Sequence, residues 1–285
     1  MYTTLISASE LLQLQRSGQT VCLMDCSFEL SQPGAGRQQY ETQHIPGAVY
    51  VHLDEHLSDK TGADRASGGR HPLPSRETFA QRLGALGVAP GMQVVVYDRQ
   101  GANYCGRLWW MLKWCGFEAV AVLDGGLAAW QAAGGELIAG PSPTPAPQRF
   151  ELKPSLAPTR TANEIAGQLG SPALTLIDAR AAARFRGEVE PLDPVAGHIP
   201  GALNRLFASN LGADGRFKPA EQLRAEFDQL LAGRDPASVV HHCGSGVSAI
   251  PNLLAMEIAG LGRSALFPGS WSEWCTTPGL PCAQG

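Results

Sequence analysis

The 285-residue chain lacks several features that would assign it to a broad class at once. It has no run of lysine or arginine, and its formal net charge is −4, so its field offers nothing to hold nucleic acid or an anionic membrane. No apolar run approaches the roughly 18 residues that a membrane span requires. The N-terminus also lacks a basic segment followed by a long apolar one. We therefore expect a cytoplasmic protein without nucleic-acid or membrane partners.

The seven cysteines have no C-x-x-C pair among them and follow no regular spacing. An odd number of scattered cysteines fits reduced thiols better than a disulfide framework. The run His241-His242-Cys243 is too compact for a usual zinc site, so we expect no bound metal and no other cofactor. A reactive cysteine must therefore be identified from its local context.

The chain repeats one order of motifs in its two halves. The interval from an aspartate at a strand end to the histidine of an H-I-P-G-A motif is 19 residues in the first half (25 to 44) and 20 in the second (178 to 198). The interval from the loop after the next strand to a tryptophan is 32 residues (98 to 130) and 31 (243 to 274). These intervals indicate an internal duplication of about 140 residues, a period too long for a solenoid.

Each copy alternates short apolar strands with helices, which predicts an α/β fold with a parallel sheet flanked by helices in each of two tandem domains. We expect strands near 20–25, 93–97, 174–178 and 239–240, and helices near 7–16, 75–86 and 250–256. Alternating prolines at 140–147 favour extended, semi-rigid backbone. The predicted domains are therefore 1–139 and 150–285, joined by a proline-rich linker at 140–149.

The second copy carries a cysteine where its strand ends, in Val239-Val240-His241-His242-Cys243-Gly244-Ser245-Gly246-Val247-Ser248-Ala249. Gly244 and Gly246 allow dihedrals closed to other residues, so the loop can curl with its N–H groups turned inward. A helix expected from Ile250 adds the partial positive charge of its N-terminus. Such a cradle stabilises anionic sulfur, and we interpret Cys243 as a nucleophile.

The double H-I-P-G-A motif, the C-G-S-G-V-S-A loop in the second copy and Gly269-Ser270-Trp271 near the end resemble the tandem-domain rhodanese sulfurtransferases. The resemblance implies that Cys243 carries sulfane sulfur as a persulfide, from 3-mercaptopyruvate or thiosulfate to cyanide or a thiol. It also implies that the first copy, with Asp98 at the cysteine position, is catalytically inactive. We expect a monomer whose partners are these small molecules.

Within this family, C-R-K-G is common in thiosulfate enzymes, whereas C-G-S-G occurs in mercaptopyruvate enzymes, as it does here. The resemblance extends to a hydroxyl, histidine and carboxylate set, which would comprise Ser245, His71 and Asp54. An R-F-x-G stretch would place Arg184 on the anionic donor. The loop residues expected to contact the donor are Gly244, Gly246, Val247 and Ser248.

One departure from the family pattern concerns a second donor-binding arginine. Mercaptopyruvate enzymes place it after Glu-Pro, but this chain has Glu190-Pro191-Leu192-Asp193. Arg107, in the first copy, is our candidate for the second charge. Arg186 is an alternative, although an arginine in that position is more often solvated.

A phosphatase and a persulfide relay are alternatives to sulfur transfer to small acceptors. A phosphatase of the related fold needs an arginine six positions after its cysteine, where this chain has Ala249. A relay module that passes the persulfide only to a protein partner would use the same loop, and the sequence leaves that alternative open.

Overall fold

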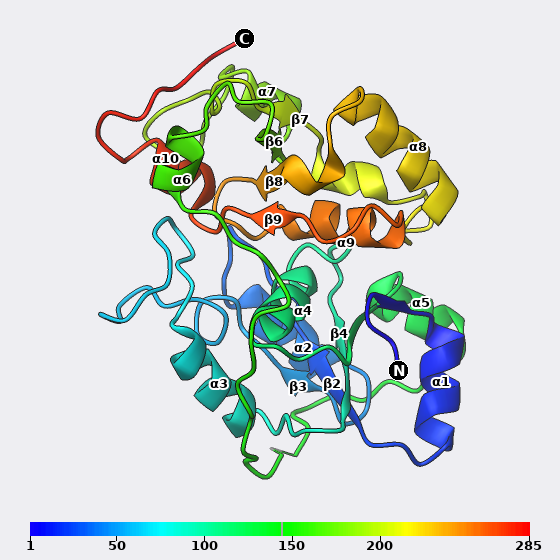
Figure 1. Cartoon of the computed structure of the whole chain (residues 1–285). Helices are drawn as coiled ribbons and strands as arrows, with labels where there is room; N and C mark the ends of the chain where they lie inside the picture. Colours follow the sequence, from blue (N-terminus) through cyan, green and yellow to red (C-terminus); the bar gives the residue numbers. More distant parts are fainter. Residues whose placement is uncertain (144) are drawn as a thin grey trace. The chain divides into compact units, whose positions relative to one another are not determined.

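The structure is a computed structural model that describes residues 1–143 and 145–285. Thr144, inside the predicted linker, lies outside the described residues. The chain divides into two compact units (Figure 1). Unit 1 comprises 1–59, 74–156 and 211–217, and unit 2 comprises 60–73, 157–210 and 218–285. Segment 60–73 is therefore part of unit 2, although the residues on both sides of it belong to unit 1. Segment 211–217 is part of unit 1, although its neighbours in sequence belong to unit 2.

Unit 1 is built on a parallel sheet. Within the described residues this sheet has five strands in the order β1-β5-β4-β2-β3. They are β1 (Leu5–Ile6), β2 (Val21–Asp25), β3 (Val49–Tyr50), β4 (Gln93–Tyr97) and β5 (Val120–Leu123). β4 is buried along its whole length, as a central strand covered on both faces should be. The helices of this unit are α1 (Ala8–Arg16), α2 (Ala35–Thr42), α3 (Arg76–Ala85), α4 (Cys105–Trp114) and α5 (Gly126–Ala132).

Unit 2 repeats this arrangement on a smaller scale. Its parallel sheet, in the part of the chain that the structure describes, has four strands in the order β7-β6-β8-β9. They are β6 (Thr175–Asp178), β7 (Leu203–Asn204), β8 (Val239–His242) and β9 (Ala265–Leu266). The α-helices are α6 (Ala162–Ala166), α7 (Ala182–Phe185), α8 (Ala220–Leu231), α9 (Ile250–Ile258) and α10 (Ser270–Trp274), with short 3-10 turns at Phe207–Asn210 and Pro236–Ser238.

The two sheets have equivalent strand orders, which confirms the predicted duplication. β2, β3, β4 and β5 of unit 1 correspond to β6, β7, β8 and β9 of unit 2. The position of β1 is marked in unit 2 by an isolated parallel bridge between Thr159 and Leu266. Asp98 and Cys243 therefore follow equivalent central strands at their carboxyl ends, the edge at which parallel α/β sheets bind ligands.

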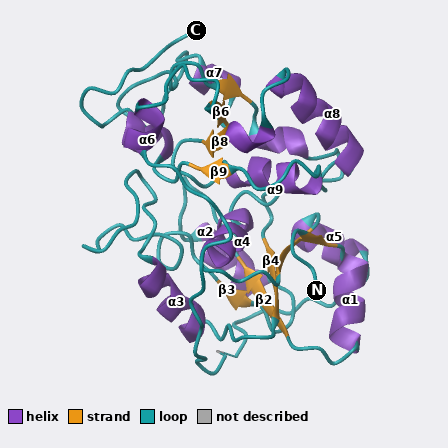
Figure 2. Ribbon diagram, viewed as in Figure 1, coloured by secondary structure: helices purple, strands orange, loops and turns teal. Residues whose placement is uncertain are grey.

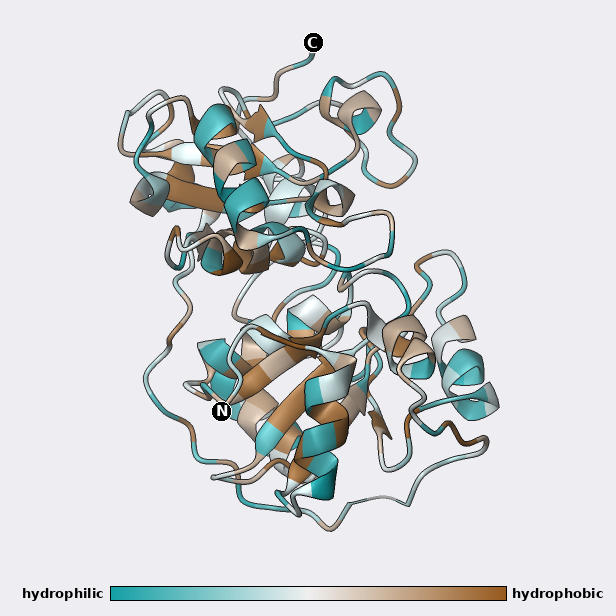
Figure 3. Cartoon of the chain, turned by 90° about the vertical axis from the view of Figure 1, so that its right-hand side faces the viewer, coloured by the Kyte–Doolittle hydropathy of each residue, from teal (hydrophilic) through white to brown (hydrophobic). Residues whose placement is uncertain are grey.

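The cores are apolar and lie on both sides of the sheets. Figure 2 shows helices flanking the strands, and Figure 3 shows hydrophobic residues concentrated along the strands. Cys105 and Cys115, at the two ends of α4, are both buried. α1 and α6 both begin with a capping box, in which Ser7 or Thr161 exchanges hydrogen bonds with a glutamate three residues later.

The histidine of each H-I-P-G-A motif has a structural role. The Nδ1 atom of His44 lies 2.8 Å from the Tyr40 carbonyl oxygen, and that of His198 lies 2.8 Å from the carbonyl oxygen of Phe185. The imidazole of His44 also stacks on the Tyr40 ring, and that of His198 stacks on the Phe185 ring, with centroids 4.0 and 3.8 Å apart. The repeated motif thus fixes a loop in each unit.

The helices of the described residues are all too short or too polar to cross a membrane.

Candidate active site

The candidate nucleophile lies at the end of β8. Cys243 is 2% exposed. Its backbone N–H donates to the Ser270 hydroxyl at 3.1 Å, and its carbonyl accepts from the Trp271 N–H at 3.0 Å. Ser270 adopts a left-handed φ of 54°, unusual for a residue with a side chain, while its hydroxyl donates to the Phe267 carbonyl. The start of α10 therefore holds the cysteine backbone in place.

The two glycines of the loop serve different purposes. Gly246 has a φ of +74°, and a Cβ atom there would lie 2.1 Å from the Pro268 carbonyl oxygen. Gly244 does not have a positive φ, so the expectation that both glycines provide special dihedrals was wrong for this one. A Cβ at Gly244 would instead lie 2.9 Å from the Arg70 Nη2 atom. Gly244 leaves room for a guanidinium beside the cysteine.

Ser245 and His71 form a hydrogen bond within unit 2. The Ser245 hydroxyl lies 2.7 Å from His71 Nδ1, and both side chains are buried. The segment that carries His71 is fixed by two further contacts, because the Gly68 N–H donates to Glu273 Oε2 at 3.2 Å and the Arg70 N–H to the Ser272 hydroxyl at 2.9 Å. The structure thus places a histidine from a distant loop against Ser245, which follows Cys243 by two positions in the sequence.

The other predicted residues divide between the two units. Val247 is buried and Ser248 half-buried in the loop that leads to α9. Asp54 and Arg107 belong to unit 1, where Arg107 is fully buried and donates to the Leu57 carbonyl at 3.5 Å. Their roles at the site stay predictions. Arg186 is exposed and paired with Glu188, as expected for a solvated arginine.

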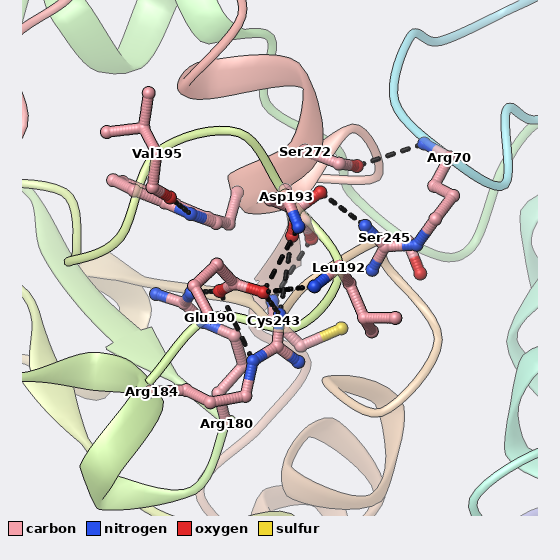
Figure 4. A network of polar contacts seen from close by, with 12 residues as sticks. Arg70, Arg180, Arg184, Glu190, Leu192, Asp193, Val195, Cys243, Ser245 and Ser272 are labelled. Carbon is pink, nitrogen blue, oxygen red and sulfur yellow. Dashed lines mark hydrogen bonds and ion pairs between the residues drawn. The ribbon is translucent and has the colours of Figure 1, made fainter. Parts of the chain in front are cut away.

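Arg184 lies beside the cysteine loop and is paired with two carboxylates. Its Nη2 atom is 2.6 Å from Glu190 Oε1 and 3.3 Å from Asp193 Oδ2. Both acids are almost completely buried, at 3% and 4% side-chain exposure. Burial works to raise the pKa of Glu190, but the hydrogen bond from Arg184 and others outweigh it, so that this pKa lies below its usual value. Figure 4 shows these contacts next to Cys243.

Arg70 is a residue of this site that the sequence reasoning missed. Its Nη1 atom forms an ion pair with Asp193 Oδ1, so the Asp193 carboxylate bridges Arg70 and Arg184. The sequence contains one indication of this role, since Arg70 directly precedes His71. An arginine in a glycine-rich polar loop, however, is usually expected to be solvated. In the sequence, Asp193 belongs to the stretch Glu190-Pro191-Leu192-Asp193, which lacks the arginine that mercaptopyruvate enzymes have there.

Arg180 and Asp178 form a buried ion pair at the carboxyl end of β6. The guanidinium lies 2.6 Å from Asp178 Oδ2 and over the Trp271 ring, 4.9 Å from its centroid. Burial favours a higher pKa for Asp178, but charge interactions with His242 and Arg180 and hydrogen bonds from Arg180 lower that pKa below its usual value. Arg180 also pairs with Glu190 at 3.3 Å and lies close enough to Cys243 for the two groups to interact electrostatically. In the described part of the chain, no three histidine, cysteine, aspartate or glutamate side chains are arranged to hold a metal ion.

The equivalent loop in unit 1 contains a carboxylate in place of the thiol. Asp98 is buried, and its Oδ1 accepts the N–H groups of Gln100 and Ala102 at 3.0 Å. Its Oδ2 accepts those of Tyr104 and Cys105 at 2.8 Å. Burial raises the pKa of Asp98, although the four amides oppose that increase. The amides of this loop therefore bind the chain's own carboxylate.

Comparison with known proteins identifies the class that this fold and site define. The family model for a rhodanese-like domain matches residues 7–133 and 161–277. The chain therefore belongs to the rhodanese family of sulfurtransferases and contains two rhodanese-like domains, as the sequence predicted. Like the enzymes of this family to which it is similar, it moves sulfane sulfur by way of a cysteine.

Individual relatives carry names for two sulfur donors. A Pseudomonas aeruginosa protein named "Probable 3-mercaptopyruvate sulfurtransferase" is 45% identical over 286 residues, 98% of this chain and 100% of that protein. A thiosulfate sulfurtransferase of Gallus gallus is 33% identical over 93% of this chain and 90% of its own length. The solved structure of SseA from Escherichia coli, described among 3-mercaptopyruvate sulfotransferases, aligns with a TM-score of 0.78 at 32% identity and covers 95% of this chain and 100% of that one. These names favour an enzyme over the relay alternative.

Proposed function

We propose that this sulfurtransferase takes the sulfur atom of 3-mercaptopyruvate, carries it as the sulfane sulfur of a persulfide on Cys243 and gives it to cyanide or a thiol. The observation that carries the proposal is the 2.7 Å hydrogen bond between the Ser245 hydroxyl and His71. Ser245 follows Cys243 by two positions in the sequence. A hydroxyl and imidazole can move a proton, which the departure of a carbon leaving group requires and the departure of sulfite does not.

In the first step, the Cys243 thiolate attacks the sulfur of mercaptopyruvate and forms an S–S bond. The carbon–sulfur bond of the donor breaks, and its electrons remain on carbon as the enolate of pyruvate. A proton that reaches this enolate through Ser245 and His71 gives pyruvate. Arg184, whose guanidinium lies beside the loop, binds the donor carboxylate by charge-assisted hydrogen bonds.

In the second step, the acceptor attacks the outer sulfur of the persulfide. Cyanide forms a bond to that sulfur and leaves as thiocyanate, while the S–S electrons return to Cys243 as thiolate. A thiol acceptor would leave as its own persulfide. The protein is then ready for another donor, and the cycle needs no external oxidant or reductant.

The remaining sequence predictions belong to the same proposal. The domains extend over 1–139 and 150–285, and the first is inactive because the amides of its loop are bound to Asp98. Asp54 completes the set with Ser245 and His71, and Arg107 adds positive charge for the donor. The loop residues Gly244, Gly246, Val247 and Ser248 border the donor. The enzyme acts as a monomer in the cytoplasm.

The decisive test compares the two donors on one preparation, with cyanide as acceptor. We expect kcat/KM for 3-mercaptopyruvate to exceed that for thiosulfate by about tenfold or more, equivalent to about 1.4 kcal/mol in transition-state binding. Intact mass should show the gain of one sulfur atom after donor and its loss after cyanide. Preference for thiosulfate would overturn the choice of donor, and the absence of added sulfur with either donor would overturn the persulfide mechanism.

Replacement of Ser245 by Ala should lower kcat/KM for mercaptopyruvate much more than kcat/KM for thiosulfate. We expect kcat/KM for mercaptopyruvate to fall about 100-fold, the typical size of a general acid–base contribution, because the enolate loses its proton source. Turnover of thiosulfate should change much less, since sulfite leaves as a stable anion. His71→Gln should have a similar effect, and the double variant should be no worse than either single one. Equal losses for both donors would show that the pair only supports the loop.

A further inference from the structure

The loop between α7 and the second H-I-P-G-A motif exposes apolar side chains and buries charged ones. In the described part of the chain, five large apolar side chains are exposed, and three of them belong to this loop: Val189, Leu192 and Val195. They are 54%, 44% and 37% exposed. The side chains of Glu190 and Asp193, which lie between them in sequence, are 3% and 4% exposed. Apolar side chains gathered in this way indicate a surface that contacts another molecule.

The buried carboxylates hold this loop against the cysteine loop. Glu190 Oε1 accepts from Arg184 Nη2 at 2.6 Å and from the backbone N–H of Leu192 at 3.0 Å. Asp193 Oδ2 lies 3.3 Å from the same guanidinium. That guanidinium faces the residue after the nucleophile, because a Cβ atom at Gly244 would lie 3.7 Å from Arg184 Nη1. Leu192, between the two carboxylates, is therefore fixed at the edge of the active site (Figure 4).

The nucleophile itself is enclosed. Cys243 is only 2% exposed, so a slender group is needed to reach the outer sulfur of its persulfide. A thiol at the end of an unbranched chain can enter such an opening, whereas the broad surface of a folded protein cannot follow it. The rest of the acceptor then stays at the edge of the site, where Leu192 is exposed. Because this side chain offers only carbon atoms, it stabilises an alkyl chain and gives no hydrogen bond to a polar group.

We propose that Leu192 is a specificity-determining residue for the acceptor, and that the acceptor is a thiol at the end of an uncharged alkyl chain. Val189 and Val195 extend the same apolar edge on either side of Leu192. The inference rests on the proposed function, since it concerns the second step of that reaction. It specifies which class of thiol takes the sulfur from the persulfide.

The transfer to such a thiol balances without another reactant. The acceptor thiolate attacks the outer sulfur of the Cys243 persulfide and forms a new S–S bond. The bond between that sulfur and the cysteine breaks, and its electron pair returns to Cys243 as thiolate. The product is an alkyl persulfide. During the attack, the methylene groups of the acceptor lie on Leu192, so each additional methylene that is removed from water lowers the barrier further.

The test follows this second step alone. The enzyme is loaded with sulfur from its donor, freed of excess donor and mixed with ethanethiol, propane-1-thiol or butane-1-thiol. Intact mass then follows the loss of the added sulfur atom. We expect the second-order rate constant to rise about threefold for each added methylene, somewhat less than complete burial of that group would give. The rate with cyanide, which has no methylene group, is the reference on each preparation.

Two variants locate the effect. Leu192→Asn replaces the isobutyl group with a polar one of similar size and should bring the three thiols to within about twofold of one another. Leu30→Asn is the matched control, because Leu30 is also exposed, at 41%, but belongs to unit 1. It should keep the dependence on chain length that the wild type has. The comparison among thiols does not depend on how much of a preparation is folded, since all are measured on the same sample.

Three outcomes would overturn the role of Leu192: wild-type rates that do not depend on chain length, the same dependence in Leu192→Asn as in the wild type, or an equal loss of dependence in Leu30→Asn. Failure of the proposed function gives a different result. In that case the wild-type protein gains no sulfur from either donor, and no loaded enzyme is obtained for the second step.

Discussion

Replacement of Cys243 by Ser should reduce sulfur transfer by at least about a thousandfold with either donor, because an alcohol at neutral pH is a far weaker nucleophile than a thiolate and cannot form a persulfide. The substitution changes one buried atom at the end of β8. The backbone bonds of residue 243 to Ser270 and Trp271 do not involve that atom, so the loop should keep its conformation. Steady-state transfer to cyanide and intact mass after donor would measure the effect.

Cys282→Ser is the matched control for this experiment. Cys282 is exposed and lies near the end of the chain, and the same substitution there should leave transfer unchanged. Thermal unfolding of both variants should remain close to that of the wild type. A Cys243→Ser protein that keeps more than a small fraction of wild-type turnover, or that still gains sulfur in its mass, would show that another thiol carries the sulfur.

Gly246→Ala should destabilise the active-site loop and nearly abolish activity. Its φ of +74° costs a residue with a side chain roughly 1 to 2 kcal/mol. The new methyl group would lie 2.1 Å from the Pro268 carbonyl oxygen, a backbone atom that cannot rotate away. Overpacking of this kind costs about 1 to 3 kcal/mol more, so we expect about 3 kcal/mol of lost stability in thermal or denaturant unfolding.

Gly244→Ala provides the contrast, because the two glycines are neighbours in one loop. Gly244 has no positive φ, and the nearest obstacle to a methyl group is the end of the flexible Arg70 side chain. We expect a stability change of less than about 1 kcal/mol, with a rise in KM as Arg70 is displaced. Equal destabilisation by the two substitutions would contradict this account of the loop.

The sequence determined the parts of the protein that depend on local patterns. Apolar patterns predicted a strand over 93–97 and a helix over 7–16, and the structure contains β4 at Gln93–Tyr97 and α1 at Ala8–Arg16, with Ser7 as the helix cap. Repetition of those patterns predicted two copies of the fold, because each copy must bury its own sheet. Cys243 was identifiable since a strand that stops at a cysteine and a glycine loop places that residue at the ligand-binding edge.

Tertiary structure alone decided which distant loops meet this edge. Arg70 and Asp193 lie 123 residues apart, and neither belongs to a periodic segment whose neighbours could be inferred. His71 and Ser245 lie 174 residues apart and were paired in advance only by resemblance to a family. The positions of such residues depend on hydrogen bonds to remote groups, such as those of Gly68 and Arg70 to Glu273 and Ser272. The sequence thus predicted a candidate nucleophile, whereas the charges around it came from chain segments that only folding brings together.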